Sequence, residues 1–211
     1  MGFNLQKTLS ALVVAAITVL TSSAASAVTV NFGTFVTGDN LGNTTLATLD
    51  AVQNGTNVDF TLNATFNAQP TSYVDYLRLN YTGALPSISA SNVSGVSYNS
   101  FSVGTANDAS LPFNIKVDWP NSNAGGSGAS RLNPGELSSF TISNVSLGLF
   151  DFGTSKSLIH VNGLAGGGST KYTGAISTGT IVSPVPVPAS LPLLLGGLGI
   201  FAGMRWRRRN S

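Results

Sequence analysis

Hydrophobic and polar residues alternate along much of the middle of this chain, with the two-residue period of strands that bury one face. Residues 58–66 are the clearest case, with apolar even positions and polar odd ones. Residues 113–119 repeat the pattern with the odd positions apolar. The other expected strands are residues 28–35, 44–52, 73–81, 93–103, 137–142, 146–150, 157–163 and 171–182. Between the two ends no segment carries a convincing apolar stripe of helical period, so the pattern predicts an all-β domain.

Turn-forming residues separate these expected strands. Clusters rich in glycine, asparagine and aspartate lie at residues 38–40 and 54–57, and a long glycine-containing loop covers residues 120–131. Such residues favour chain reversal because they tolerate the backbone angles of tight turns. Many short strands at this spacing predict a single antiparallel β-sandwich, jelly-roll-like, over residues 28–184.

The first 27 residues predict a cleaved secretory signal peptide. Lys7 supplies positive charge ahead of an apolar run at residues 9–20, and Ala25 and Ala27 form the small-x-small site of signal peptidase. We expect cleavage after Ala27 and export of the β domain. The alternative interpretation is a buried helix at the start of a cytosolic domain.

The last 27 residues predict a membrane segment of fixed orientation. Residues 189–204 are mostly apolar and carry no charge. As a helix, residues 189–206 reach about 27 Å, close to the thickness of a hydrocarbon core. Clustered positive charge stays on the cytoplasmic side. We therefore expect the domain to face outward from the cytoplasmic membrane, with the C-terminus inside. The alternative is an apolar core segment with a solvated basic tail. The topology-setting residues are Arg205, Arg207, Arg208 and Arg209.

A short proline motif precedes this segment, and it consists of Val185, Pro186, Val187, Pro188 and Ala189. Together with the apolar helix, the arginine-rich end and the signal peptide, it resembles the PEP-CTERM sorting signal in its VPLPA-type variant. Val187 stands where that variant has leucine. The resemblance implies recognition by an exosortase, a membrane transpeptidase that cuts near the motif and transfers the domain to another anchor or releases it. It also implies association with exopolysaccharide or biofilm matrix.

Charge and composition narrow the partners of the domain. The whole chain has a net charge of +2, yet residues 28–184 hold five basic and eight acidic residues, a net charge of −3. Nucleic-acid binding requires clustered lysine and arginine, so we expect no nucleic-acid partner. The chain has no cysteine, which excludes thiol nucleophiles and thiolate zinc sites.

Candidate catalytic residues are few. His160 is the single histidine, and no Gly-x-Ser-x-Gly elbow supplies the serine that a hydrolase would pair with it. The loop at residues 38–43 offers oxygen ligands for calcium but lacks a second carboxylate. We therefore expect neither an enzyme, nor a cofactor, nor a metal site. A hydrolase centred on His160 is kept as a third hypothesis.

Aromatic side chains raise a different function. Tyr76 is expected to point outward from its strand, and we take Tyr76 and Trp119 as candidate glycan contacts. Tyr73 and Tyr81 lie on the apolar face of the same strand and are expected in the core. The leading hypothesis is thus a non-catalytic, structural or adhesive surface protein. The alternative is a carbohydrate-binding module on the cell surface.

Overall fold

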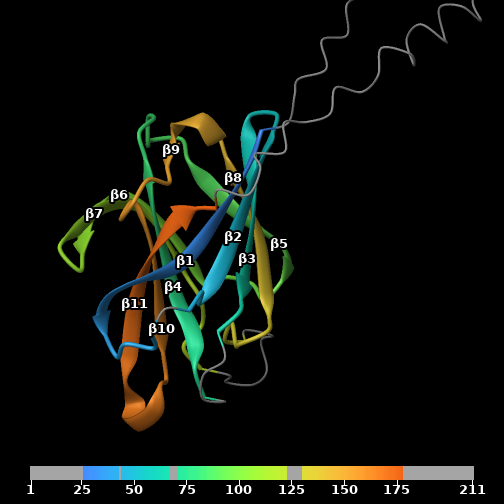
Figure 1. Ribbon diagram of the computed structural model, residues 1–211. Helices are drawn as coiled ribbons and strands as arrows, with labels where there is room; N and C mark the ends of the chain where they lie inside the picture. The colour runs from blue at the N-terminus through green and yellow to red at the C-terminus, as the bar shows by residue number, and fades with distance from the viewer. Residues whose placement is uncertain (1–25, 43, 67–70, 123–129, 178–211) are drawn as a thin grey trace, which may run out of the picture. The chain divides into compact units, whose positions relative to one another are not determined.

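The structure is a computed structural model that describes residues 26–42, 44–66, 71–122 and 130–177. These ranges contain strands and two short 3-10 helices (Figure 1). The elements are β1 (Ala27–Gly38), β2 (Ala47–Asn54), β3 (Asn57–Ala64), β4 (Tyr73–Tyr81), β5 (Ser89–Gly95), β6 (Ser100–Asp108), β7 (Leu111–Asp118), β8 (Leu137–Ser143), η2 (Leu147–Leu149), β9 (Phe150–Asp151), β10 (Ser157–Asn162), η3 (Ala165–Gly167) and β11 (Ser169–Ile176).

All strand pairs in this part of the chain are antiparallel, which confirms the prediction of an all-β antiparallel fold. The strands follow one hydrogen-bonded path, β5-β8-β3-β2-β1-β11-β10-β4-β7-β6, and β9 pairs with β4 beside it. The sheet curls until it is nearly closed into a barrel. It therefore differs from two separate sheets, because β1 pairs with β2 on one side and β11 on the other.

The alternating pattern is confirmed where it was clearest. In β3 the apolar side chains of Val58, Phe60, Leu62 and Ala64 are buried, and the polar residues between them are partly exposed. Tyr73 and Tyr81 are buried as predicted. Residues from both halves of the curled sheet join one apolar core, in which Phe60 stacks on Phe140 with ring centroids 5.4 Å apart. Apolar burial on the inner face thus holds the two halves together.

One predicted strand is wrong in an informative way. Residues 93–103 form the end of β5 and the start of β6, which lie at opposite ends of the sheet path. Gly95 makes the corner possible, because its φ of +72° suits glycine and a Cβ there would lie 2.3 Å from the Leu137 carbonyl oxygen. Beyond this corner the chain no longer pairs with β8 and pairs with β7 instead, where the Asn99 N–H donates to the Asp118 carbonyl.

A second correction concerns residues 146–150. They were expected to be a strand, but Leu147–Leu149 form the 3-10 helix η2, and only Phe150–Asp151 extend as β9. The side chain of Leu147 is buried in the core, whereas Leu149 is exposed. The apolar spacing of this segment was therefore too short to distinguish a strand from one helical turn.

The two ends of the described domain lie side by side. Val30 of β1 pairs with Ile176 of β11, and the Ser177 N–H donates to the Thr29 carbonyl at 2.8 Å. The described ranges contain no helix with the length and apolarity needed to cross a membrane. The predicted signal helix before residue 26 and the predicted helix at residues 189–206 lie outside these ranges.

Candidate functional site

The outward side chains of the curled sheet fall into two groups. We call the outer side of β1, β2, β3, β5 and β8 the hydroxyl face, because these strands contain no lysine, arginine or histidine. We call the outer side of β4, β7, β10 and β11 the charged face. It carries Arg78, Lys116, His160 and Lys171. The domain therefore presents two outer surfaces that differ in their chemistry.

Tyr76 lies at the centre of the charged face, but it is not exposed. Its side chain is only 9% accessible and packs with Phe113 and Leu158 in a small second apolar cluster. The charged ends of Lys116 and Arg78 lie 4.6 and 5.4 Å from its ring centroid. The expectation that Tyr76 offers a free ring to a glycan is therefore wrong, since other side chains cover both its edges and its faces.

The cover comes from the tip of the β6–β7 hairpin, residues 108–113. Ala109 and Leu111 pack against the cluster that contains Tyr76. Both central residues of the turn, Ala109 and Ser110, have positive φ angles, of 48° and 64°. Asp108 accepts hydrogen bonds from Arg78 Nε at 3.2 Å and from Lys171 Nζ at 2.5 Å. Because Lys171 is on β11, four places from β6 along the sheet path, the hairpin tip must fold back over the charged face.

The pKa values of two acids follow from this closure. Burial raises the pKa of the Tyr76 hydroxyl far above its usual value of 10.0, and the neighbouring Asp108 carboxylate raises it further. Burial alone would also raise the pKa of Asp108. Hydrogen bonds from Lys171, Tyr76 and Arg78 outweigh it, so the pKa of Asp108 falls below 3.8. Asp108 is therefore ionised at neutral pH and neutralises two cations.

His160 also belongs to this face. It lies in a strand, β10, as expected, and its Nδ1 is 2.9 Å from the Asp75 carboxylate. Its ring packs on Tyr76, with centroids 4.7 Å apart. Among the described residues no serine hydroxyl bonds to this ring, and serine is what a hydrolase centred on His160 requires. The contacts are those of a hydrogen-bonded pair of side chains on neighbouring strands.

Trp119 is the second aromatic residue that requires correction. Its side chain is 2% exposed, lies in the main core beside Phe140, and donates from Nε1 to the Ser138 hydroxyl at 2.9 Å. A ring in this position cannot stack on a glycan. The alternation of residues 113–119 already placed Trp119 on the inner side, so the signal was present in the sequence.

Along β3 and residues 139–143 of β8, the outward residues of the hydroxyl face are small and polar and are held in register. Thr61 of β3 lies opposite Asp50 of β2 and Ser139 of β8, and Ser139 lies opposite Ser94 of β5. The next row places Asp59 opposite Thr141. Adjacent strands lie about 4.8 Å apart, so these rows set polar groups at regular short intervals.

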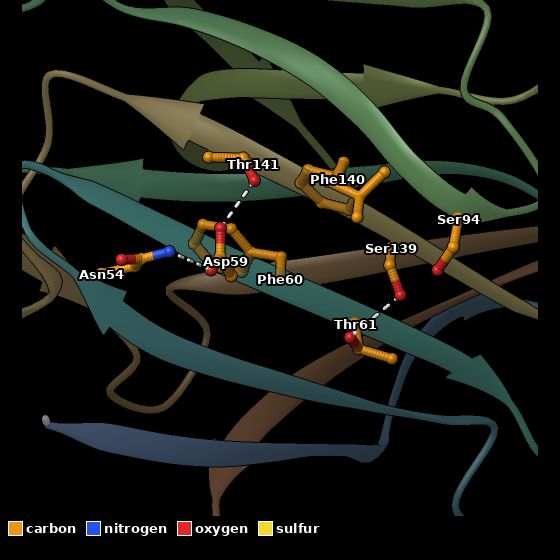
Figure 2. Close-up of a pocket in the computed structure, with 9 residues that line it drawn as sticks. Asn54, Asp59, Phe60, Thr61, Ser94, Ser139, Phe140 and Thr141 are labelled. Atoms are coloured by element: carbon orange, nitrogen blue, oxygen red, sulfur yellow. Dashed lines mark hydrogen bonds between the residues drawn. The ribbon is translucent and has the colours of Figure 1, made fainter.

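A hollow of about 410 Å³ lies on this face over β3, β5 and β8 (Figure 2). The Asp59 carboxylate accepts from Thr141 Oγ1 at 2.6 Å and from Asn54 Nδ2 at 2.9 Å. The hydroxyls of Thr61 and Ser139 are 3.1 Å apart and share a hydrogen bond. These bonds fix the side chains that line the hollow, and no aromatic residue stands exposed within it.

A β-bulge shapes the edge of this hollow. Between the pairs Asn92–Phe140 and Ser94–Ser139, β5 has one extra residue, Val93, opposite β8. Val93 is 64% exposed and lines the hollow together with Ser94. The bulge therefore places a methyl-bearing side chain and a hydroxyl at the rim. The sequence pattern did not predict this site, because the alternation within β5 or β8 alone does not show that these two strands pair.

A second hollow, of about 600 Å³, follows the first along β3. Its lining includes Asn63 of β3, Thr48 of β2, and Glu136 just before β8. Asp59 and Thr61 border the first hollow, and Asn63 is the next outward residue of the same strand. The two depressions thus lie along one line of outward polar side chains.

The remaining candidate residues lie at the ends of the chain and in one loop. Ala25 and the sorting motif at residues 185–189 are outside the described residues, as are the four C-terminal arginines. Ala27 begins β1 and pairs with Val52, so cleavage after it would remove one residue pair. In the loop after β1, the Tyr172 hydroxyl accepts from the Leu41 N–H at 3.0 Å. The described residues contain no group of three or more metal-binding side chains.

Comparisons with known proteins add no relative to this description. A scan against protein-family models, a search of curated proteins and a search of solved structures each found no significant match to the chain.

Proposed function

We propose that this chain is an exported surface protein whose β domain has a structural or adhesive, non-catalytic role outside the cell. The observation that carries the proposal is the placement of the domain between two apolar segments of different design. An apolar run at residues 9–20 precedes it, and another, ended by the cluster that begins at Arg205, follows it. The first directs export, and the second stops transfer with the arginines in the cytoplasm.

The partners of this proposal are the cytoplasmic membrane and a processing enzyme. The segment from Val185 to Ala189 resembles a sorting motif of the PEP-CTERM type, so an exosortase-like transpeptidase is the proposed enzyme. It would cut near the motif and pass the domain to its final anchor or release it. Exopolysaccharide at the cell surface is the proposed setting of the domain, as the resemblance implies.

The domain has features that suit a role outside the cell. Its core needs no disulfide, and the five strands of the hydroxyl face present hydroxyls, amides, a few exposed apolar side chains and only two carboxylates, Asp50 and Asp59. We further propose that the two halves of the curled sheet act as the layers of a jelly-roll-like sandwich. The single core shared by both halves supports this view.

Protease accessibility tests the proposed topology. The full chain would carry one epitope in the exposed Gly55–Thr56 turn and a second after Ser211. Protease added to spheroplasts should remove the first epitope and spare the second, and detergent should expose both. Deleting residues 185–211 should release the domain from the membrane fraction. A protected β domain with a digested C-terminus would overturn the proposal.

A carbohydrate-binding role is the second candidate function. The two aromatic residues first considered for it, Tyr76 and Trp119, are buried. The observation that now favours it is the hollow on the hydroxyl face.

A further inference from the structure

We propose that the hydroxyl face binds a neutral, linear polysaccharide that runs along β3 through both hollows. This inference deepens the adhesive role proposed above and rests on it for its setting. Its evidence is independent of the export signals, because it consists of side chains within β2, β3, β5 and β8. Figure 2 shows the first of these hollows.

The lining of the first hollow matches the chemistry of sugar hydroxyls. A sugar hydroxyl both donates and accepts hydrogen bonds, and a site for it must offer both functions. The Thr61–Ser139 pair uses one O–H in its mutual bond, which leaves the other O–H and several lone pairs available. Asp59 accepts from Thr141 and Asn54 and retains further lone pairs for donors. The hollow therefore has acceptors and donors within a short distance of each other.

The same side chains are already held in position. Asp59 is fixed from both sides by Thr141 and Asn54, and Thr61 and Ser139 fix each other. Groups arranged in this way lose little freedom when a ligand arrives. The exposed methyl groups of Val93 offer an apolar contact at the rim, which suits the C–H surface of a sugar ring.

The charges of this face disfavour an anionic ligand. The five strands of the hydroxyl face contain Asp50 and Asp59 and no basic residue. An anionic polymer would meet the carboxylates of Asp50 and Asp59 on these strands and that of Glu136 beside the second hollow, and neither hollow is lined by a cation, so its binding is disfavoured. The strand cations Arg78, Lys116 and Lys171 all lie on the charged face, where Asp108 and Asp118 pair with them.

The length of the site indicates a polymer rather than a single sugar. Outward residues Asp59 and Asn63 are about 14 Å apart along β3, and the two hollows extend past them. No exposed aromatic ring lines either hollow, so each contact is weak. Useful retention then comes from many contacts along one chain and from many copies of the protein on one surface.

A depletion assay with insoluble polysaccharides tests the inference. The full chain, held in a detergent without a sugar head group, is mixed with particles of cellulose, β-1,3-glucan, mannan or starch. Alginate beads serve as the anionic comparison. The fraction bound is measured over a range of polymer concentrations. We expect retention by at least one neutral polymer and weaker retention by alginate.

Two variants act on the hollow in different ways. Thr61→Val with Ser139→Ala removes both hydroxyls and preserves the shape. Ser94→Leu, at the exposed rim, fills the space without adding an aromatic ring. Each should weaken the apparent affinity at least fivefold, which is about the effect of one lost hydrogen bond. The matched control, Thr105→Val with Ser102→Ala on exposed positions of β6, should bind like the unmodified chain. Circular dichroism melting curves verify that all variants are folded.

Three results would each overturn the inference: no retention by any of the four neutral polymers, equal retention of the unmodified chain and both hollow variants, or preferred binding to alginate. The topology experiment separates this failure from failure of the proposed function. A chain with its domain outside the membrane that ignores every polymer contradicts the polysaccharide site alone. A chain that binds cellulose but faces the cytoplasm contradicts the surface role alone.

Discussion

Asp108 joins the hairpin tip to the charged face, and replacing it with asparagine tests that role directly. The Asp108→Asn change keeps the size of the side chain and removes its charge. Arg78 and Lys171 then lose the carboxylate that neutralises them, although their side chains are only 16% and 24% exposed. We expect a loss of folding stability without a change in the overall fold.

The magnitude lies between two limits. Breaking a fully buried ion pair costs about 3–5 kcal/mol, whereas exposed pairs contribute at most about 1 kcal/mol. Asp108 is 7% exposed but its partners reach solvent, so we expect about 2 kcal/mol. For a domain of this size such a loss lowers Tm by about 4–8 °C.

Equilibrium unfolding in guanidinium chloride measures this difference, and pH identifies its cause. The folded pKa of Asp108 is below 3.8, so its stabilising effect is present above that value and is lost as the pH falls through the folded pKa. The gap between the two proteins should therefore be full at pH 7 and shrink below pH 4. Asp39→Asn, at an exposed position, is the control. A stability gap under about 0.5 kcal/mol, which is the size of an ordinary surface substitution, would refute the reasoning. A gap of the same size at pH 7 and pH 3 would refute it as well.

Three further changes have defined outcomes. Gly95→Ala should destabilise the domain by about 2–4 kcal/mol, because its Cβ would meet the Leu137 carbonyl; chemical denaturation at pH 7 checks this, and a neutral effect would contradict the corner geometry. Trp119→Phe should cost about 2–3 kcal/mol by leaving the Ser138 hydroxyl unpaired, while polysaccharide retention stays unchanged; reduced retention would place Trp119 in the site after all. Above pH 10 the unfolded chain ionises Tyr76 and the folded chain does not, so stability should fall; Tyr76→Phe should lessen that fall in alkaline melting curves, and an identical fall in both would argue against burial of the hydroxyl.

The strands were predictable where one face meets the core. In β3 and β7 the period of two follows directly from burial, and the inward residues were identified correctly. The corner between β5 and β6 was not predictable, because alternation continues through residues 93–103 although the pairing partner changes from β8 to β7. Pairing partners depend on contacts between distant segments, which local periodicity does not encode.

The candidate site shows the same limit. Tyr76 was correctly placed on the outward side of its strand, yet the hairpin tip at residues 108–113 covers that side. The two-residue alternation of a strand predicts which face a side chain lies on, but it does not predict which other segment covers that face. The hollow was missed for the related reason that Thr61, Ser139 and Ser94 meet only once three strands are in register. A single small polar residue outside a known motif does not indicate a binding site in a sequence.

The position of β11 has a mechanical consequence. β11 lies between β1 and β10, and the chain continues from its end toward the proposed anchor. If load enters through that end while a polymer holds the opposite half of the sheet, the force runs along the strand. Two rows of hydrogen bonds would then have to rupture in shear together, rather than opening one after another as in a zipper. Force spectroscopy that pulls from Ser177 should accordingly give higher rupture forces than pulling from the edge strand β6.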